Sequence, residues 1–392
     1  MSEKMKNPKG TRDILPKEKI LKNKIIDLLE NTFGKYGFEP LETPAIQKYD
    51  VLSSKYAGGS EILEETYSFK DRGERKLGLR YDLTVPLCRV IASNKQIPKP
   101  FKRYEIGRAW RDGPVKKGRL REFWQCDVDT IGSDNMLADA EFMKIVEEVL
   151  EELDLNFTIK FNNRKILDGI LESVGVSKVI WNSFLQSIDK LEKIGKDGVK
   201  KELMNKGFES ETIDNVFDII LKKGKDEELL NKLEEINNEH MRQGLREIKE
   251  LRNYAKLLGI DENNMKWDIS LSRGLDYYTS TVYETFLEDS EVTSAIAAGG
   301  RYDDIIGSFM EEEERIPAVG LSFGIDAIIE AIETSEKTSV KVLVVPIGQK
   351  KEAIKAVSEL RKMDINADID LMERGISKNL DYANSKGIPY TI

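Results

Sequence analysis

The sequence predicts an α+β protein that carries a helical insertion and a C-terminal α/β unit. Residues 101–130 hold two strand-like runs joined by a basic Gly/Pro loop, which is typical of an antiparallel hairpin. Residues 164–258 are helical in pattern, and residues 339–392 alternate apolar strands with helices in a βαβαβ order. A chain of 392 residues is expected to form two or three domains.

Composition excludes several classes of function. The net charge of −9 argues against general nucleic-acid coating, yet residues 99–121 hold nine Lys/Arg and two acidic residues and could form a local basic site. Two cysteines, Cys88 and Cys126, cannot build a disulfide framework and have no metal-ligand spacing. The single histidine, His240, falls in a helical pattern, which disfavours histidine-based acid/base chemistry. No signal core or membrane-length apolar run is present, so we expect a cytoplasmic protein without a membrane partner.

The N-terminal third predicts a helix followed by short strands. An irregular basic segment at 9–16 precedes a helix over 17–36, which Gly34 and Gly37 end. Prolines at 40 and 44 punctuate a short strand over 38–47, and further strands are predicted at 67–69 and 76–81. Asp82 and Thr84 stand at a strand end just before a helix with Pro86 in its first turn. Asp82 could serve as a helix cap or as a binding carboxylate.

The predicted hairpin at 101–130 places charge and polarity in one neighbourhood. Its second strand, 123–129, carries Gln125, Asp127 and Asp129 two residues apart, so all three side chains share one face. Arginines in the connecting loop suit phosphate oxygens, and Phe123 offers a flat face for a base. A solvated basic loop without a ligand is the alternative.

The remaining elements follow in order. We predict a helix over 137–153, a strand over 157–162, the helical insertion from 164, and strands at 267–270 and 281–286. An apolar strand, Gly324 and a helix fill 317–328. The C-terminal unit is predicted as strand, helix 350–363, strand, helix 377–385 and strand 388–392, after a linker at 330–338.

Several of these segments resemble the class II aminoacyl-tRNA synthetases. Arg111 with GRLREFWQCDVD resembles their motif 2, in the form found in histidyl-tRNA synthetases of the archaeal and eukaryotic branch. SRGLDYYTS and AAGGRYDDIIG resemble the two histidine-specific signatures of that family. The first helix and strand resemble motif 1, and 317–328 resembles motif 3. Each of these segments also has a purely structural alternative. Asp276 and Arg301 of the two signatures could form an ion pair that only holds the fold together. The helical insertion could be a charged, solvent-exposed domain without a binding role.

The resemblance implies a domain plan and an activity. It implies a class II catalytic core at 1–163 and 264–332, built on an antiparallel sheet flanked by helices, with a helical insertion domain at 164–263. An anticodon-binding-like domain follows at 339–392, shorter than the usual module. The implied activity is that of a histidine–tRNA ligase, which converts histidine and ATP to histidyl-adenylate and pyrophosphate and then transfers the histidyl group to tRNA(His). ATP would be a substrate, Mg²⁺ would accompany it, and motif 1 would form a homodimer interface.

The resemblance also assigns residues. Arg111 and Arg273 would be catalytic at the α-phosphate, and Gly299 and Gly300 would let the backbone approach a ligand closely. Histidine would be bound by Asp82, Leu83, Thr84, Arg111, Gln125, Asp129, Arg273, Tyr277, Tyr278 and Tyr302. ATP would be bound by Arg111, Arg119, Phe123 and Gly324.

One departure leaves an alternative open. Where the family has a motif 3 arginine over adenine, this chain has Ala327. Losing such a cation–π contact costs about 0.5–2 kcal/mol. Ala327 and the short C-terminal unit favour a non-enzymatic, histidine-sensing paralogue such as the regulatory subunit of ATP phosphoribosyltransferase. The motif 2 arginines and Arg273 favour the ligase.

Overall fold

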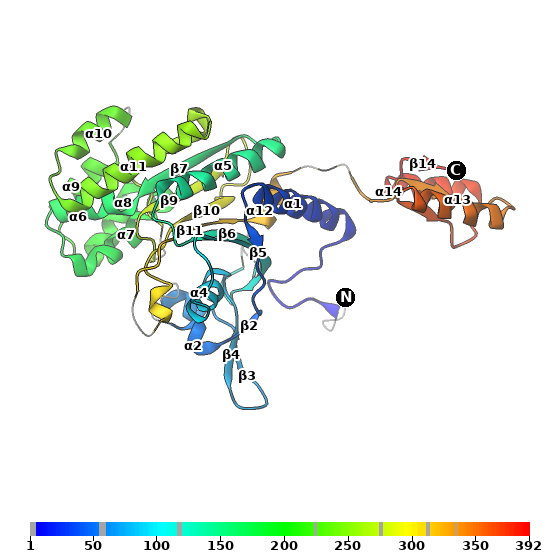
Figure 1. The fold of residues 1–392 in the computed structure, drawn as a ribbon, viewed down its shortest axis with the longest axis horizontal. Helices are drawn as coiled ribbons and strands as arrows, with labels where there is room; N and C mark the ends of the chain where they lie inside the picture. Colours follow the sequence, from blue (N-terminus) through cyan, green and yellow to red (C-terminus); the bar gives the residue numbers. More distant parts are fainter. Residues whose placement is uncertain are drawn as a thin grey trace. The chain divides into compact units, whose positions relative to one another are not determined.

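A computed structural model describes residues 5–54, 60–115, 120–222, 226–273, 277–310, 314–332, 334 and 336–392 (Figure 1). Contacts divide the chain into two compact units. The larger unit holds Pro8–Thr11 and Leu29–Ile328, and the smaller unit holds Ile329–Ile392 with the rest of the N-terminal segment. The larger unit contains both strands of the predicted hairpin.

An eight-stranded sheet forms the centre of the larger unit, in the order β1-β5-β6-β11-β10-β9-β7-β8. The β1–β5 and β7–β8 pairs are parallel and the other pairs are antiparallel. Its strands are β1 (Glu39–Pro40), β5 (Phe101–Trp110), β6 (Glu122–Ile131), β7 (Phe157–Asn163), β8 (Met265–Trp267), β9 (Thr281–Leu287), β10 (Ala297–Arg301) and β11 (Ala318–Phe323). The expected antiparallel core is therefore confirmed.

The predicted hairpin is the longest pairing of this sheet. Strands β5 and β6 pair in register from Phe101 opposite Ile131 to Trp110 opposite Glu122. The other edge of β6 pairs with β11, so Asp127 lies opposite Ser322 and Asp129 lies opposite Gly320. This register brings hairpin residues beside a strand that lies almost 200 positions later in the chain.

Helices cover the central sheet. Helix α5 (Met136–Glu152) packs on β10 and β11, and the C-terminal half of α1 (Pro16–Lys35) places Phe33 against Phe323 of β11. Helix α12 (Ile325–Ala331) begins directly after β11. Asn135 caps α5, because its side chain accepts a hydrogen bond from the Leu137 amide.

The larger unit also contains a second, three-stranded sheet, which is followed by helix α4. The sheet has the order β2-β4-β3, with β2 (Ile46–Lys48), β3 (Ser68–Lys70) and β4 (Lys76–Leu79). Helix α4 (Thr84–Ser93) follows β4 and packs its Leu87, Cys88 and Ile91 against Tyr302 and Ile305. Two short helices, α2 (Tyr49–Leu52) and α3 (Ser60–Glu64), lie in the same region of the sequence.

The stretch from 164 to 258 is helical, as its pattern predicts. It contains α6 (Arg164–Ser173), α7 (Trp181–Ile188), α8 (Leu191–Asn205), α9 (Ser210–Ile220), α10 (Asp226–Glu234) and α11 (Glu239–Leu257). Helix α11 packs on α5, α6 and β7, which joins this layer to the sheet. The strand predicted at 267–270 was misplaced: β8 ends at Trp267, and the Asp268 side chain then accepts from the Ser270 amide and starts a turn.

The C-terminal unit has the predicted βαβαβ order. Its parallel sheet has the order β13-β12-β14, and its elements are β12 (Val342–Val344), α13 (Lys350–Lys362), β13 (Ala367–Ile369), α14 (Ile376–Lys386) and β14 (Tyr390–Thr391). Apolar residues of β12 and α13, among them Val342, Val344 and Val357, form its core. No helix in the described parts of the chain combines the length and the apolar character needed to cross a bilayer.

Candidate active site

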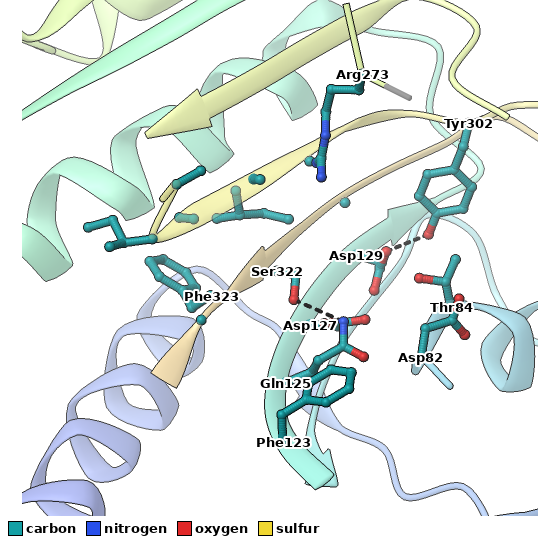
Figure 2. A pocket seen from close by; sticks show the side chains of 18 of the residues that line it. Asp82, Thr84, Phe123, Gln125, Asp127, Asp129, Arg273, Tyr302, Ser322 and Phe323 are labelled. Atoms are coloured by element: carbon teal, nitrogen blue, oxygen red, sulfur yellow. Dashed lines mark hydrogen bonds between the residues drawn. The ribbon is translucent and has the colours of Figure 1, made fainter. Parts of the chain in front are cut away.

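A cavity of about 310 Å³ opens on the face of the central sheet formed by β6, β11 and β10 (Figure 2). Nearly all predicted site residues line it. They are Asp82, Thr84, Arg111, Phe123, Gln125, Asp129, Arg273, Tyr277, Tyr278, Tyr302 and Gly324. Residues from five distant parts of the sequence thus meet at one place.

Of the other two predicted residues, one does not line the cavity and one lies outside the described residues. Leu83 is fully buried and does not line the cavity, because it stands between Asp82 and Thr84 and turns its side chain into the core toward Gly107. Its carbonyl oxygen instead accepts a 3.5 Å hydrogen bond from Arg103. Arg119 lies outside the described residues, as does Asp276 of the first signature.

The predicted alternation along β6 holds. Gln125, Asp127 and Asp129 all line the cavity, as period-2 geometry requires (Figure 2). Gln125 donates to the hydroxyl of Ser322 on the neighbouring strand at 3.4 Å. The sequence placed Asp127 on this face but gave it no role, and it gave no indication of Ser322.

Asp129 is held by a buried cation and a phenol. Its Oδ2 lies 2.7 Å from the guanidinium of Arg103, and its Oδ1 accepts a hydrogen bond from the Tyr302 hydroxyl. Burial raises the pKa of Asp129, and the charge of Arg103 opposes that rise. Arg103, which the sequence did not single out, lies opposite Asp129 on β5 and is completely buried.

Asp82 bonds to the start of α4 and also lines the cavity, so its position is compatible with both roles left open by the sequence. Its Oδ1 accepts a 3.0 Å hydrogen bond from the Val85 amide at the start of α4, so it caps the helix. The same side chain lines the cavity, where burial raises its pKa and Arg111 opposes that effect. The cap fixes the carboxylate at the cavity wall.

Two guanidinium groups supply positive charge. Arg111 donates from Nε to the carbonyl of Tyr81 at 3.0 Å, and its Cζ lies 5.1 Å from the centre of the Phe123 ring. Arg273 donates from Nη1 to the hydroxyl oxygen of Tyr278 at 3.1 Å, and its Nε lies 3.4 Å from Glu284. These contacts aim both cations into the cavity that also holds the acceptors of β6.

Three glycines make room for the cavity wall. A Cβ on Gly320 would fall 1.9 Å from Asp129 Oδ1, and one on Gly300 would fall 2.8 Å from the Tyr278 ring. A Cβ on Gly299 would meet the carbonyl oxygen of Gly320 at 2.0 Å. The glycines of the second signature therefore permit close approach of β11 and Tyr278.

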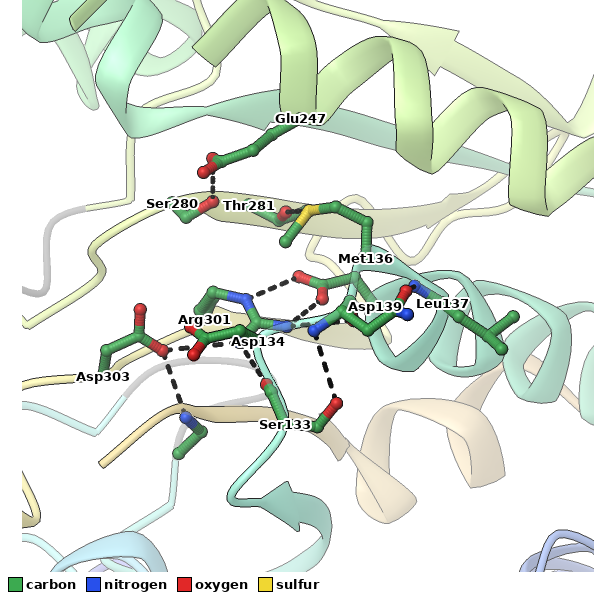
Figure 3. A network of polar contacts seen from close by, with 12 residues as sticks. Ser133, Asp134, Met136, Leu137, Asp139, Glu247, Ser280, Thr281, Arg301 and Asp303 are labelled. Atoms are coloured by element: carbon green, nitrogen blue, oxygen red, sulfur yellow. Dashed lines mark hydrogen bonds and ion pairs between the residues drawn. The ribbon is translucent and has the colours of Figure 1, made fainter. Parts of the chain in front are cut away.

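A polar network behind the cavity holds the second signature (Figure 3). Arg301 pairs with Asp139 of α5 and with Asp303 at 3.5 Å, and it donates to the Ser133 carbonyl at 2.7 Å. Among the described residues, Asp139 and Asp303 are the acidic partners of Arg301; Asp276, the partner considered from the sequence, lies outside the described residues. The network fixes the strand end that precedes Tyr302.

The described residues do not form a resident metal site. No three Asp, Glu, His or Cys side chains in the described part of the chain are grouped closely enough to hold a metal ion. His240 contacts Trp181 edge to face, with ring centres 5.4 Å apart, and does not line the cavity.

Comparison with known proteins gives the family. A family model described as histidyl-tRNA synthetase matches residues 10–328, and one described as an anticodon binding domain matches residues 341–392. Histidine–tRNA ligase 1 of Bacillus cereus is 43% identical over 391 residues, which cover 99% of this chain and 91% of the relative. Histidine–tRNA ligase of Clostridium tetani is 37% identical, with coverage of 98% and 89%.

Solved structures of histidyl-tRNA synthetases resemble this chain as well. The crystal structure of histidyl-tRNA synthetase from Nostoc sp. matches with a TM-score of 0.87 and 31% identity, over 98% of this chain and 90% of that one. A Bacillus halodurans structure described as an ATP phosphoribosyltransferase regulatory subunit/histidyl-tRNA synthetase has a TM-score of 0.81 over 99% and 97% of the two chains. At 21% identity, it shows the fold alone. These relatives are bacterial and give no support to the archaeal and eukaryotic branch expected from motif 2. The chain belongs to the histidyl-tRNA synthetase family.

Proposed function

We propose that this protein is a histidine–tRNA ligase that activates histidine with ATP and transfers the histidyl group to tRNA(His). The observation that carries the proposal is one cavity with acceptors at β6 and guanidinium groups from Arg111 and Arg273. An amino acid presents an ammonium group and ATP presents phosphates, so the two kinds of side chain match the two substrates.

The first step needs no protein nucleophile. The histidine carboxylate attacks the α-phosphorus, the bond to the pyrophosphate oxygen breaks, and histidyl-adenylate and pyrophosphate result. Both cysteines are buried, and burial raises the pKa of each thiol well above its usual range. Catalysis therefore depends on positioning and on charge: Arg111 and Arg273 would hold the α-phosphate and neutralise the charge that builds there.

Selection of histidine is assigned to the acceptor side. Asp82, Thr84 and Gln125 would bind the ammonium group, while Asp129 and the hydroxyl of Tyr278 would contact the two imidazole nitrogens. The hydroxyl of Tyr278 accepts from Arg273, which leaves its own hydrogen available to a ligand nitrogen. An amino acid without ring nitrogens would leave these buried groups unpaired, a loss of several kcal/mol.

ATP would occupy the guanidinium side. Phe123 would stack on adenine, with Gly324 and Arg119 as further contacts. Because the described residues offer no metal cluster, magnesium would enter on the phosphates of ATP as part of the substrate. A homodimer through the motif 1 region, a cytoplasmic location and the predicted domain boundaries belong to the same proposal.

The sensor remains the second candidate, and Ala327 is the observation that favours it. Ala327 lies in α12, which begins directly after Gly324, and its methyl side chain cannot supply a cation to the base. A protein that binds histidine without activating it would not need that cation.

One assay separates the two candidates. Histidine-dependent exchange of pyrophosphate into ATP, followed by charging of tRNA(His), is expected for the ligase. Histidine binding without exchange would support the sensor and overturn the proposal. The Arg273→Ala variant should lose exchange and keep its fold, whereas the control Arg75→Ala, at an exposed ion pair with Asp71, should keep both.

A further inference from the structure

The third acidic residue of the cavity has no assigned role. Asp127 is 4% exposed, lines the cavity, and stands between Gln125 and Asp129 on β6 (Figure 2). Its Oδ1 is buried and has no hydrogen-bond partner among the described residues. A buried carboxylate oxygen without a donor is costly, so its position at a binding cavity calls for a ligand.

The nearby guanidinium groups of Arg103 and Arg273 are paired with other acidic residues and form no ion pair with Asp127. Arg103 is committed to Asp129 at 2.7 Å and lies 3.9 Å from Glu105. Arg273 is paired with Glu284. Over the described ranges, no ion pair is formed by Asp127 itself. The carboxylate of Asp127 instead forms a hydrogen bond with the hydroxyl of Ser322, the residue opposite it on β11.

The electrostatic surroundings agree with a missing positive charge. Burial raises the pKa of Asp127 to about 7; Arg103 and Ser322 oppose the rise, while Asp129 and Asp82 add to it. Asp82 and Asp127 both line the cavity, and their negative charges repel each other. A cation placed between them would relieve both carboxylates.

We infer that Asp127 binds the α-ammonium group of the amino-acid substrate directly, as a specificity residue opposite Asp82. This inference rests on the proposed function, since histidine is the ligand that brings the ammonium group. A metal ion is a poorer occupant, because the described residues group no three metal ligands.

Asp127 and Asp129 differ in their contacts, and this difference suits them to two different groups of the histidine ligand. Asp129 already receives the Tyr302 hydroxyl and the Arg103 guanidinium, so it suits a neutral N–H donor such as imidazole. Asp127 has an unused oxygen and no cation, so it suits the group that carries a full positive charge. Ser322 is the positioning residue that orients it.

The test compares histidine with one analogue that lacks the ammonium group and one that keeps it but lacks the carboxylate. Affinities of histidine, histidinol and 3-(imidazol-4-yl)propionate are measured by calorimetry, with competition against histidine for the weakest. Asp127→Asn should weaken histidine and histidinol about ten- to hundredfold, the range of a charge-assisted hydrogen bond, and change the ammonium-free analogue less than threefold. Ser322→Ala should show the same selectivity with a smaller loss.

The controls make each outcome decisive. Asp218→Asn removes a carboxylate from the exposed side of α9 and should leave all three affinities unchanged. Equal losses for all three ligands in Asp127→Asn, or no loss for histidine, would overturn the inference while the wild-type protein still binds histidine. If the wild-type protein itself binds no histidine, the proposed function fails, and the inference fails with it.

Discussion

The carboxylate of Asp129 and the guanidinium of Arg103 lie 2.7 Å apart, directly opposite each other on β6 and β5. Both side chains are buried, and Arg103 is completely so. Arg103 also lies 3.9 Å from Glu105, which pairs with Arg80 at 2.7 Å. A buried chain of alternating charges therefore ends at the residue proposed to bind the imidazole ring.

Removing Arg103 should destabilise the larger unit strongly. Arg103→Met leaves Asp129 buried without its cation, and breaking a buried pair costs about 3–5 kcal/mol. Urea unfolding followed by tryptophan fluorescence measures this, because all four tryptophans, at positions 110, 124, 181 and 267, lie in the larger unit. The control Arg75→Met breaks an exposed pair and should cost less than about 1 kcal/mol. Similar losses in the two variants would contradict the assignment.

A methyl group at Gly320 should damage the histidine site. The Cβ of Gly320→Ala would collide with Asp129 Oδ1 at 1.9 Å and would also crowd the Val128 carbonyl at 3.1 Å. Asp129 must then move, and a displacement of this size should raise the KM for histidine tenfold or more. Gly34→Ala is the matched control, since no atom lies within 4 Å of its added Cβ. Steady-state exchange kinetics that show no difference between the two variants would be evidence against this picture.

Some of the residues at the cavity could be predicted from the sequence, whereas others could not. Period-2 alternation sufficed to place Gln125, Asp127 and Asp129 on one face, and the signatures identified Arg273, Tyr278 and Tyr302. The contacts of Arg103, Ser322 and Gly320 arise from cross-strand register between distant segments, which no local pattern specifies. Leu83 does not line the cavity, because a motif covers adjacent residues whereas adjacent side chains point in different directions.

The stability of the ligand-free protein should carry a pH dependence that Asp127 creates. Its pKa rises from 3.8 to about 7 on folding, so between these values the folded state binds more protons than the unfolded state. The contribution of Asp127 to stability is therefore full below pH 3.8 and is lost as pH rises toward 7, at up to about 1.4 kcal/mol per pH unit.

Asp127→Asn removes this dependence, because asparagine does not titrate. The variant should be more stable than the wild-type protein at pH 8 and should lose that advantage as pH falls toward 4. Thermal melts across this range, without histidine, give the difference between the two proteins. A difference that does not vary with pH would show that Asp127 keeps an ordinary pKa in the fold.

Phe123 should matter for ATP and not for histidine. Its ring lines the cavity, and its loss would remove the proposed stacking face for adenine while leaving the Arg111 hydrogen bond to the Tyr81 carbonyl in place. Stacking of a base on an aromatic ring contributes about 1–3 kcal/mol, so Phe123→Ala should raise the KM for ATP roughly five- to a hundredfold. Phe123→Tyr keeps the ring and should restore most of the affinity. Histidine binding measured by calorimetry without ATP should stay within threefold of wild type; a larger loss there would place Phe123 in the amino-acid site instead.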